Sequence, residues 1–208
     1  LPLLSAIFLM VSSSKLPPTI VAFFGTGSVG LSALLTCNLT WQFLQDPGLI
    51  TVTLWTWIKV GELNADVGFH IDGLTIIMMM IITCIGFLIH LFSCEFMEDD
   101  TSYSRYFAYL NMFVSAMLVL VMSDNLLLLY LGWEGVGVCS YLLVGFWYQH
   151  SGNGHAARKA FIVTRIGDTA MMLGLLILFT ELRTLEIQSI TASAQARWQT
   201  GDFMPTLA

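Results

Sequence analysis

Residues Leu126 to Gly145, LLLLYLGWEGVGVCSYLLVG, form an apolar stretch with one acidic side chain, Glu134. Roughly 20 apolar residues cross a hydrocarbon core of about 30 Å, because each residue of an α-helix rises about 1.5 Å. Glu134 follows Asn125 by about nine residues, so it lies about 14 Å deep, near the midplane. An ionised group there costs at least ~2.5 kcal/mol. The position predicts a carboxylate that carries protons, the alternative being an idle acid neutralised by a neighbour.

The composition indicates that the whole chain is an integral membrane protein. Of its 208 residues, 56% are hydrophobic and 11% are charged, roughly half the charged fraction of a soluble protein. The mean hydropathy is +0.77. Lys and Arg total only 8, and no basic patch with interleaved aromatic residues occurs. We therefore expect the lipid bilayer as a partner and no nucleic acid.

The apolar stretches predict an all-α polytopic membrane protein with about six transmembrane helices. They lie at residues 1–10 (the rest of a first span), 16–45, 73–96, 106–122, 126–145 and 160–182. Asp72 is a candidate N-cap for the third span, and the turn Ser123-Asp124-Asn125 supplies N-cap side chains for the fifth.

Two segments outside the spans have periodic patterns of their own. Apolar and polar residues alternate over 51–60 and again over 67–71, with the turn-like GELNAD at 61–66 between them. This pattern predicts a short β-hairpin on one membrane face. After the sixth span, apolar residues recur at spacings of three and four, which predicts a surface amphipathic helix. They are Ile187, Ile190, Ala194 and Trp198.

One motif is typical of a different class of protein. Gly25, Gly27 and Gly30 spell G-x-G-x-x-G, the dinucleotide-binding fingerprint, which would make the chain a nucleotide-binding oxidoreductase. That fingerprint requires a βαβ unit, whereas these glycines lie within an uncharged apolar stretch with no second strand at the required spacing. Small residues about four apart in a membrane helix favour close helix packing instead.

Cysteine and histidine give no pattern of metal ligands. The four cysteines at 37, 84, 94 and 139 lie in or beside apolar segments without C-x-x-C spacing, so we expect buried thiols and neither disulfides nor a metal site. His90 is expected to hydrogen-bond at the headgroup level, a relay role being the alternative. His150 and His155 have no accompanying carboxylate or cysteine and are expected at the surface.

The sixth span contains a second pair of ionisable residues, Arg165 and Asp168, three positions apart and so on one helix face. Neighbouring spans joined by a short loop run antiparallel. Counted from Ala156, Asp168 is about 18 Å from one face and so about 12 Å from the other, close to the depth of Glu134. Three ionisable groups are therefore expected in one layer, as a transport site or as a structural ion pair.

Two opposing effects would act on Glu134 in that layer. A low dielectric favours the neutral acid, whereas a nearby cation such as Arg165 favours the carboxylate. A group balanced in this way can take up and release a proton as neighbouring charges shift. Gly132, Gly135 and Gly137 either leave room for water beside the acid or permit close helix packing.

The segment Tyr103 to Tyr148, which contains WEGVG, and the segment Lys159 to Asp168, KAFIVTRIGD, closely resemble one family. It is the antiporter-like subunit L of respiratory NADH:quinone oxidoreductase (complex I), the bacterial counterpart of mitochondrial subunit 5. FHIDGLT at Phe69 to Thr75 and GFLIH at Gly86 to His90 extend the resemblance. It covers essentially the whole chain.

The resemblance implies a proton-translocating subunit of the membrane arm without a redox centre of its own. Glu134 matches the glutamate of the family's fifth helix, which is thought to pair with a lysine on the seventh. Arg165 and Asp168 match the charged pair of the sixth helix. Residues 1–208 would be the N-terminal part of one antiporter-like domain, a fragment that lacks the later helices and could not pump alone.

The same resemblance implies the surroundings of the chain. FMN, iron–sulfur clusters and quinone are expected in other subunits of the complex, and no cofactor in this chain. The expected partners are other membrane-arm subunits, including a second antiporter-like subunit, with protons as cargo. The expected location is the bacterial inner membrane in preference to the mitochondrial inner membrane. A multisubunit Na⁺/H⁺ antiporter would share the same helices and the same glutamate, and stays open as the alternative.

Overall fold

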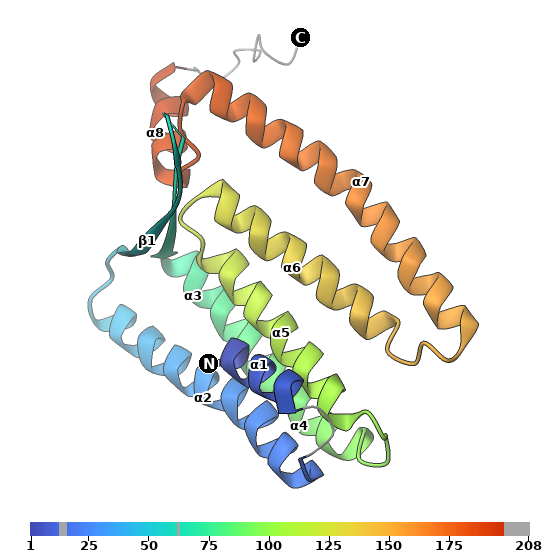
Figure 1. The fold of residues 1–208 in the computed structure, drawn as a ribbon. Coiled ribbons are helices and arrows are strands. Elements are labelled where there is room, and N and C mark those ends of the chain that lie inside the picture. Colours follow the sequence, from blue (N-terminus) through green and yellow to red (C-terminus); the bar gives the residue numbers. More distant parts are fainter. Residues whose placement is uncertain (13–15, 62, 198–208) are drawn as a thin grey trace.

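The computed structural model describes residues 1–12, 16–61 and 63–197 and is a helical bundle with one β-hairpin at one end (Figure 1). Its elements, in chain order, are α1 (Pro2–Ser12), α2 (Pro18–Gln45), β1 (Ile50–Val60), β2 (Leu63–Ile71), α3 (Gly73–Met80), the π-helical turn η1 (Ile81–Ile85), α4 (Gly86–Phe96), α5 (Tyr103–Met122), α6 (Leu126–Val144), α7 (Ser151–Leu182) and α8 (Ile187–Arg197).

Among the described residues, five helical segments are long and apolar enough to cross a membrane. They are α2, the continuous segment α3–η1–α4, α5, α6 and α7, which confirms the five full spans expected. The short apolar α1 corresponds to the expected partial span. Two helices begin earlier than predicted, α5 at Tyr103 and α7 at Ser151. In α7 the polar residues before Ala160 include good helix formers and no proline, so the helix extends beyond its apolar part.

The third span contains a local irregularity that its apolar sequence does not reveal. The Oδ1 atom of Asp72 accepts a hydrogen bond from the backbone N–H of Thr75 at 2.8 Å, so the predicted N-cap is confirmed. The helix then widens into the π-turn η1 and continues as α4. Buried Thr83 lies in this turn, and its hydroxyl donates to the carbonyl of Met79 at 2.7 Å.

The core of the bundle centres on Phe107 of α5, which is fully buried between residues of α1, α2 and the end of α6. A Cβ atom added to Gly25 would lie 2.6 Å from the Phe107 ring, and one added to Gly30 would lie 2.8 Å from the ring of Phe87. Gly27, by contrast, has open space around it. Gly25 and Gly30 therefore let aromatic rings pack against α2, and the fingerprint motif is a helix-packing surface.

The predicted hairpin is confirmed, with antiparallel pairing from Ile50 opposite Ile71 to Val60 opposite Leu63. Its turn is tighter than the expected GELNAD loop, because Asn64, Ala65 and Asp66 belong to β2. Two register shifts in β1, between Thr53 and Trp55 and between Thr56 and Ile58, interrupt the simple alternation of faces.

The hairpin is held to the bundle by a cluster of hydrogen bonds that we call the hairpin junction. The side-chain amide of Asn125 donates to the carbonyl of Asp66 at 2.7 Å, and the backbone N–H of Leu126 donates to the carbonyl of Leu185 at 2.9 Å. The junction therefore joins β2, the α5–α6 turn and the α7–α8 turn. The described part of α8 lies beside β2 (Figure 1), with Gln188 3.2 Å from His70, whereas Trp198 of the predicted helix lies outside the described residues.

His90 is fully buried inside the protein. Its Nδ1 atom lies 2.7 Å from the carbonyl oxygen of Gly86, which can only accept, so Nδ1 carries the proton. The amide of Asn111 on α5 lies 3.4 Å from Nε2. The ring is thus enclosed by a neighbouring helix.

His150 and His155 are exposed, as predicted.

All four cysteines are free thiols. Cys139 is buried, and Cys84 and Cys94 are half-buried. Cys37 is exposed on α2, so the expectation of burial is wrong at that position. A thiol is apolar enough to face lipid from the outer surface of a membrane helix.

Candidate functional site

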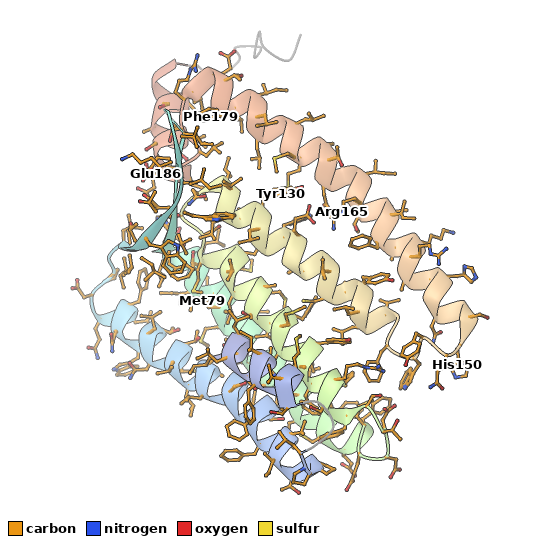
Figure 2. The ribbon with its side chains drawn as sticks, viewed as in Figure 1. Met79, Tyr130, His150, Arg165, Phe179 and Glu186 are labelled. Atoms are coloured by element: carbon orange, nitrogen blue, oxygen red, sulfur yellow. The ribbon has the colours of Figure 1, made fainter. Side chains whose placement is uncertain are left out.

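The site lies between α6 and α7, which run beside each other with Tyr130 and Arg165 projecting into the space between them (Figure 2). Glycines fix the position of α6 against α5. A Cβ atom on Gly132 would lie 2.6 Å from the backbone nitrogen of Leu120, and one on Gly135 would lie 3.0 Å from the Cβ of Ala116. Of the two roles predicted for the glycines, close packing therefore applies to Gly132 and Gly135. Gly137 has open space around it.

The three predicted residues come together, with Arg165 between the two acids. Arg165 of α7 forms an ion pair with Glu134 of α6 through Nη1 and Oε2. The same Nη1 atom lies 3.9 Å from Oδ2 of Asp168, one turn further along α7. The side chain of Asp168 is only 5% exposed and that of Glu134 19%, whereas Arg165 is 38% exposed. One guanidinium therefore faces a buried and a half-buried carboxylate.

Three aromatic residues that were not predicted from the sequence complete the site. The indole Nε1 of Trp133 donates to Oδ1 of Asp168 at 2.7 Å. The guanidinium of Arg165 lies 4.6 Å from the centre of the Phe161 ring. Tyr130, one turn before Glu134 on α6, projects into the space between α6 and α7 (Figure 2). The (i, i+4) spacings of Tyr130 to Glu134 and of Phe161 to Arg165 were the available sequence signals.

Asp168 also lines a cavity of about 640 Å³. Trp133, Gly137 and Ser140 of α6 line it together with Thr164 and Gly167 of α7, and the remaining walls come from apolar side chains of η1, α5, α6 and α7. A buried carboxylate in such a wall is costly while charged and unpaired. Here the indole N–H and the guanidinium compensate part of that cost.

The arrangement places one cation within reach of two acids. Within residues 1–12, 16–61 and 63–197, no group of three or more His, Cys, Asp or Glu side chains could hold a metal ion. The guanidinium lies close to both acids, so a small rotation of its side chain changes the acid with which it pairs.

Two family models match the chain. The model described as "NADH-Ubiquinone oxidoreductase (complex I), chain 5 N-terminus" matches residues 57–107. The model described as "NADH:quinone oxidoreductase/Mrp antiporter, TM" matches residues 123–206, which include all three charged residues of the site. The two matches together cover more than half of the chain.

Curated relatives carry the same family names. NADH-quinone oxidoreductase subunit L of Pseudomonas aeruginosa is 45% identical over 210 residues, which span 100% of this chain and 34% of the relative. The Escherichia coli subunit L is 44% identical over 98% of this chain and 33% of the relative. NADH-ubiquinone oxidoreductase chain 5 of Dictyostelium discoideum is 36% identical over 91% of this chain and 28% of the relative. The chain thus spans about a third of the length of these relatives.

Solved structures share the fold at low sequence identity. The Mrp complex from Dietzia sp. DQ12-45-1b matches with a TM-score of 0.76 and 18% identity, over 97% of this chain and 21% of that chain. An archaeal membrane-bound sulfane sulfur reductase matches with a TM-score of 0.76 and 19% identity, over 94% of this chain and 29% of that chain. The chain is a multi-pass membrane protein, and it belongs to the family of antiporter-like membrane subunits that comprises subunit L (chain 5) of NADH:quinone oxidoreductase and its Mrp antiporter relatives.

Proposed function

We propose that this chain carries part of a proton channel in the membrane arm of a bacterial NADH:quinone oxidoreductase. The observation that supports the proposal most directly is the position of Arg165 between Glu134 and Asp168, inside a segment apolar enough to span a membrane. Ionisable groups within spans mark proton pathways by default. The names of the similar proteins agree with this function.

In the proposed mechanism, Arg165 controls the charge of Glu134. While the guanidinium pairs with Glu134, that carboxylate stays ionised without a proton. If Arg165 moves toward Asp168, Glu134 loses its cation in apolar surroundings and binds a proton to become neutral. The return of Arg165 expels the proton. In the structure the Trp133 indole donates to one oxygen of Asp168, and this bond would stay in place while Arg165 changes partner.

The resting geometry suits this exchange. The Nη1 atom that pairs with Glu134 is already only 3.9 Å from Asp168, so a rotation of the side chain is enough to change partner. The face of the guanidinium lies over the Phe161 ring, which stabilises the cation without supplying a competing negative charge.

The rest of the proposal concerns the complete protein. NADH oxidation and quinone reduction would take place in other subunits, which would hold FMN, iron–sulfur clusters and quinone, and this chain would hold no redox centre. Its partners would be other membrane-arm subunits, including a second antiporter-like subunit. The bacterial inner membrane is the proposed location.

A second function is favoured by one specific observation. The family model that matches residues 123–206 also describes Mrp antiporters, so exchange of Na⁺ for H⁺ would use the same helices. Proton uptake that requires NADH and a quinone distinguishes the oxidoreductase from an antiporter, which would instead respond to a sodium gradient.

Replacing Glu134 by glutamine in the full-length protein tests the proposed function. Glutamine has nearly the same shape but cannot bind and release a proton at neutral pH. We expect NADH-driven proton uptake into membrane vesicles to fall sharply while the subunit stays at wild-type abundance. The matched control is E98Q, which removes the same charge from an exposed residue outside the spans. Unchanged pumping in E134Q would contradict the proposal.

A further inference from the structure

A second cationic side chain, Arg105, lies away from the proposed channel and lacks an acidic partner in the described part of the chain. Among those residues, no carboxylate lies within 4.0 Å of its guanidinium. Of its five N–H donors, the only one with an acceptor there is on Nη2, which donates to the carbonyl of Phe146 at 3.4 Å. The Nε atom is buried and has no hydrogen-bond partner within residues 1–12, 16–61 and 63–197. Buried donors without partners are rare and call for a ligand or an explanation.

Two aromatic rings lie within cation–π distance of this guanidinium, but they supply no acceptor for its N–H groups. The Cζ atom of Arg105 lies 4.8 Å from the centre of the Phe146 ring and 5.2 Å from that of Tyr148. Such contacts stabilise the cation. The N–H groups point along the plane, in the fork geometry that matches an oxyanion such as a carboxylate or phosphate.

Arg105 borders a cavity of about 220 Å³ that can hold such an anion. Tyr109, Tyr141 and Tyr148 line the same cavity. Gly154, near the N-terminus of α7, forms another part of the wall, and a Cβ atom there would meet nothing within 4 Å. The cavity thus combines a guanidinium with open space beside the positive end of a helix dipole.

The acid nearest to Arg105 in sequence does not compete for its guanidinium. Arg158 and Lys159 are exposed on α7 and do not line the cavity. Asp100 is the acid closest in sequence to Arg105 on its N-terminal side, and its two oxygens are already engaged. Oδ2 accepts from the indole of Trp147 at 2.8 Å and Oδ1 from the backbone of Ser102 at 2.7 Å.

The position of the cavity along the helices indicates which anion would fill it. Arg105 is in the first turn of α5, and Phe146 directly follows the end of α6, so the cavity lies at the end of two membrane spans. Trp147 and Tyr148 are aromatic residues of the kind that mark the headgroup level. Basic pockets between membrane helices at that level bind anionic lipid headgroups.

We propose that Arg105 and the cavity beside it bind the phosphate group of an anionic phospholipid. One phosphate oxygen would accept from the free edge of the guanidinium, the glycerol backbone would lie beside the tyrosines, and the acyl chains would continue along the outer surface of α5–α7. This site is separate from the proposed proton channel, so its test does not depend on pumping.

The test is native mass spectrometry of the full-length protein in detergent, titrated with dioctanoyl phosphatidylglycerol, with dioctanoyl phosphatidylcholine and with sodium phosphate. For the tightest phosphatidylglycerol adduct we expect roughly tenfold weaker binding or more in R105Q, the loss typical of a charge-assisted hydrogen bond. R158Q, which removes an exposed charge from the same end of the bundle, should bind like the wild type. Phosphatidylcholine and phosphate should bind weakly to all three proteins.

A second variant leaves Arg105 intact and blocks the cavity. Gly154→Leu places a side chain in the open space of that wall, so it should also weaken phosphatidylglycerol binding, with unchanged helical content by circular dichroism. Equal binding of phosphatidylglycerol by wild type, R105Q and G154L would overturn the proposal. An equal loss in R105Q and R158Q would overturn it too, because it would indicate general surface charge. Tight binding of phosphate in place of the lipid would overturn the assignment to a phospholipid.

Discussion

Replacing Gly132 by alanine tests whether the close approach of α5 and α6 positions the proposed channel. In the structure, a Cβ atom at this position would lie 2.6 Å from the backbone nitrogen and 2.7 Å from the Cα of Leu120. Both distances are about 1 Å shorter than the optimum of roughly 3.5 Å for non-bonded heavy atoms. The obstructing atoms belong to the backbone of α5, so no side-chain rotation relieves the contact and the two helices must separate.

The expected magnitude follows from two opposing terms. Alanine stabilises a helix by about 1 kcal/mol relative to glycine. Overpacking of a tight contact costs about 1–3 kcal/mol. At Gly137, on the same helix, an added Cβ atom would meet nothing within 4 Å, so G137A gains the first term without the second. The difference between G132A and G137A should therefore be about 1–3 kcal/mol in the free energy of unfolding.

The assay compares full-length wild type, G132A and G137A in mixed micelles, with unfolding by sodium dodecyl sulfate followed by circular dichroism. We expect G137A to be as stable as the wild type or slightly more stable, and G132A to be the least stable. Proton uptake should fall in G132A, since Glu134 is two residues from the contact. Equal stability of the two alanine variants would refute the reasoning, because it would mean that the helices do not touch at Gly132.

Two further predictions concern single hydrogen bonds. Asp72→Ala should lower the free energy of unfolding at neutral pH by about 0.5–2 kcal/mol, the usual cost of losing an N-cap. The hydrogen bond from the backbone N–H of Thr75 is the main cause that lowers the pKa of Asp72. The stability that this N-cap contributes is therefore fully present above the ordinary carboxyl pKa, and it is lost as the pH falls through the lowered pKa of Asp72. Wild type and D72A should then converge in acid unfolding curves, and a constant difference would contradict this role. Trp133→Phe removes the donor to Asp168 but keeps an aromatic ring, so proton uptake should fall at unchanged abundance, and wild-type uptake would exclude a part for this bond.

Much of the fold follows from patterns that operate within one element. The length and apolar character of each span depend only on bilayer thickness, and the caps at Asp72 and Asn125 depend only on a side chain and the N–H three residues later. The π-turn η1 could not be predicted this way, since its sequence IITCI is ordinary apolar helix. The buried position of His90 depends on Asn111, which comes from another helix.

In the candidate site, too, some features follow from single helices and others depend on how two helices pack. The meeting of Glu134, Arg165 and Asp168 could be predicted from two regularities. The rise per residue and the antiparallel order of α6 and α7 determine how deep each residue lies in the membrane, and the spacing of three places Arg165 and Asp168 on the same face of α7. Depth does not determine how α6 and α7 are rotated about their axes. The contact between Trp133 and Asp168 depends on that rotation, so it became visible only in three dimensions.

The hydrogen bonds of the hairpin junction can form only in a certain order while the chain is being translated. The bond between Asn125 and Asp66 can form once the α5–α6 turn has been synthesised, whereas Leu185 is translated about 60 residues later. At roughly 5–20 residues per second the ribosome needs about 3–12 s for that interval. During that interval the junction can contain only the contacts between β2 and the α5–α6 turn, and the bond from Leu126 to Leu185 can form only after the α7–α8 turn has been made.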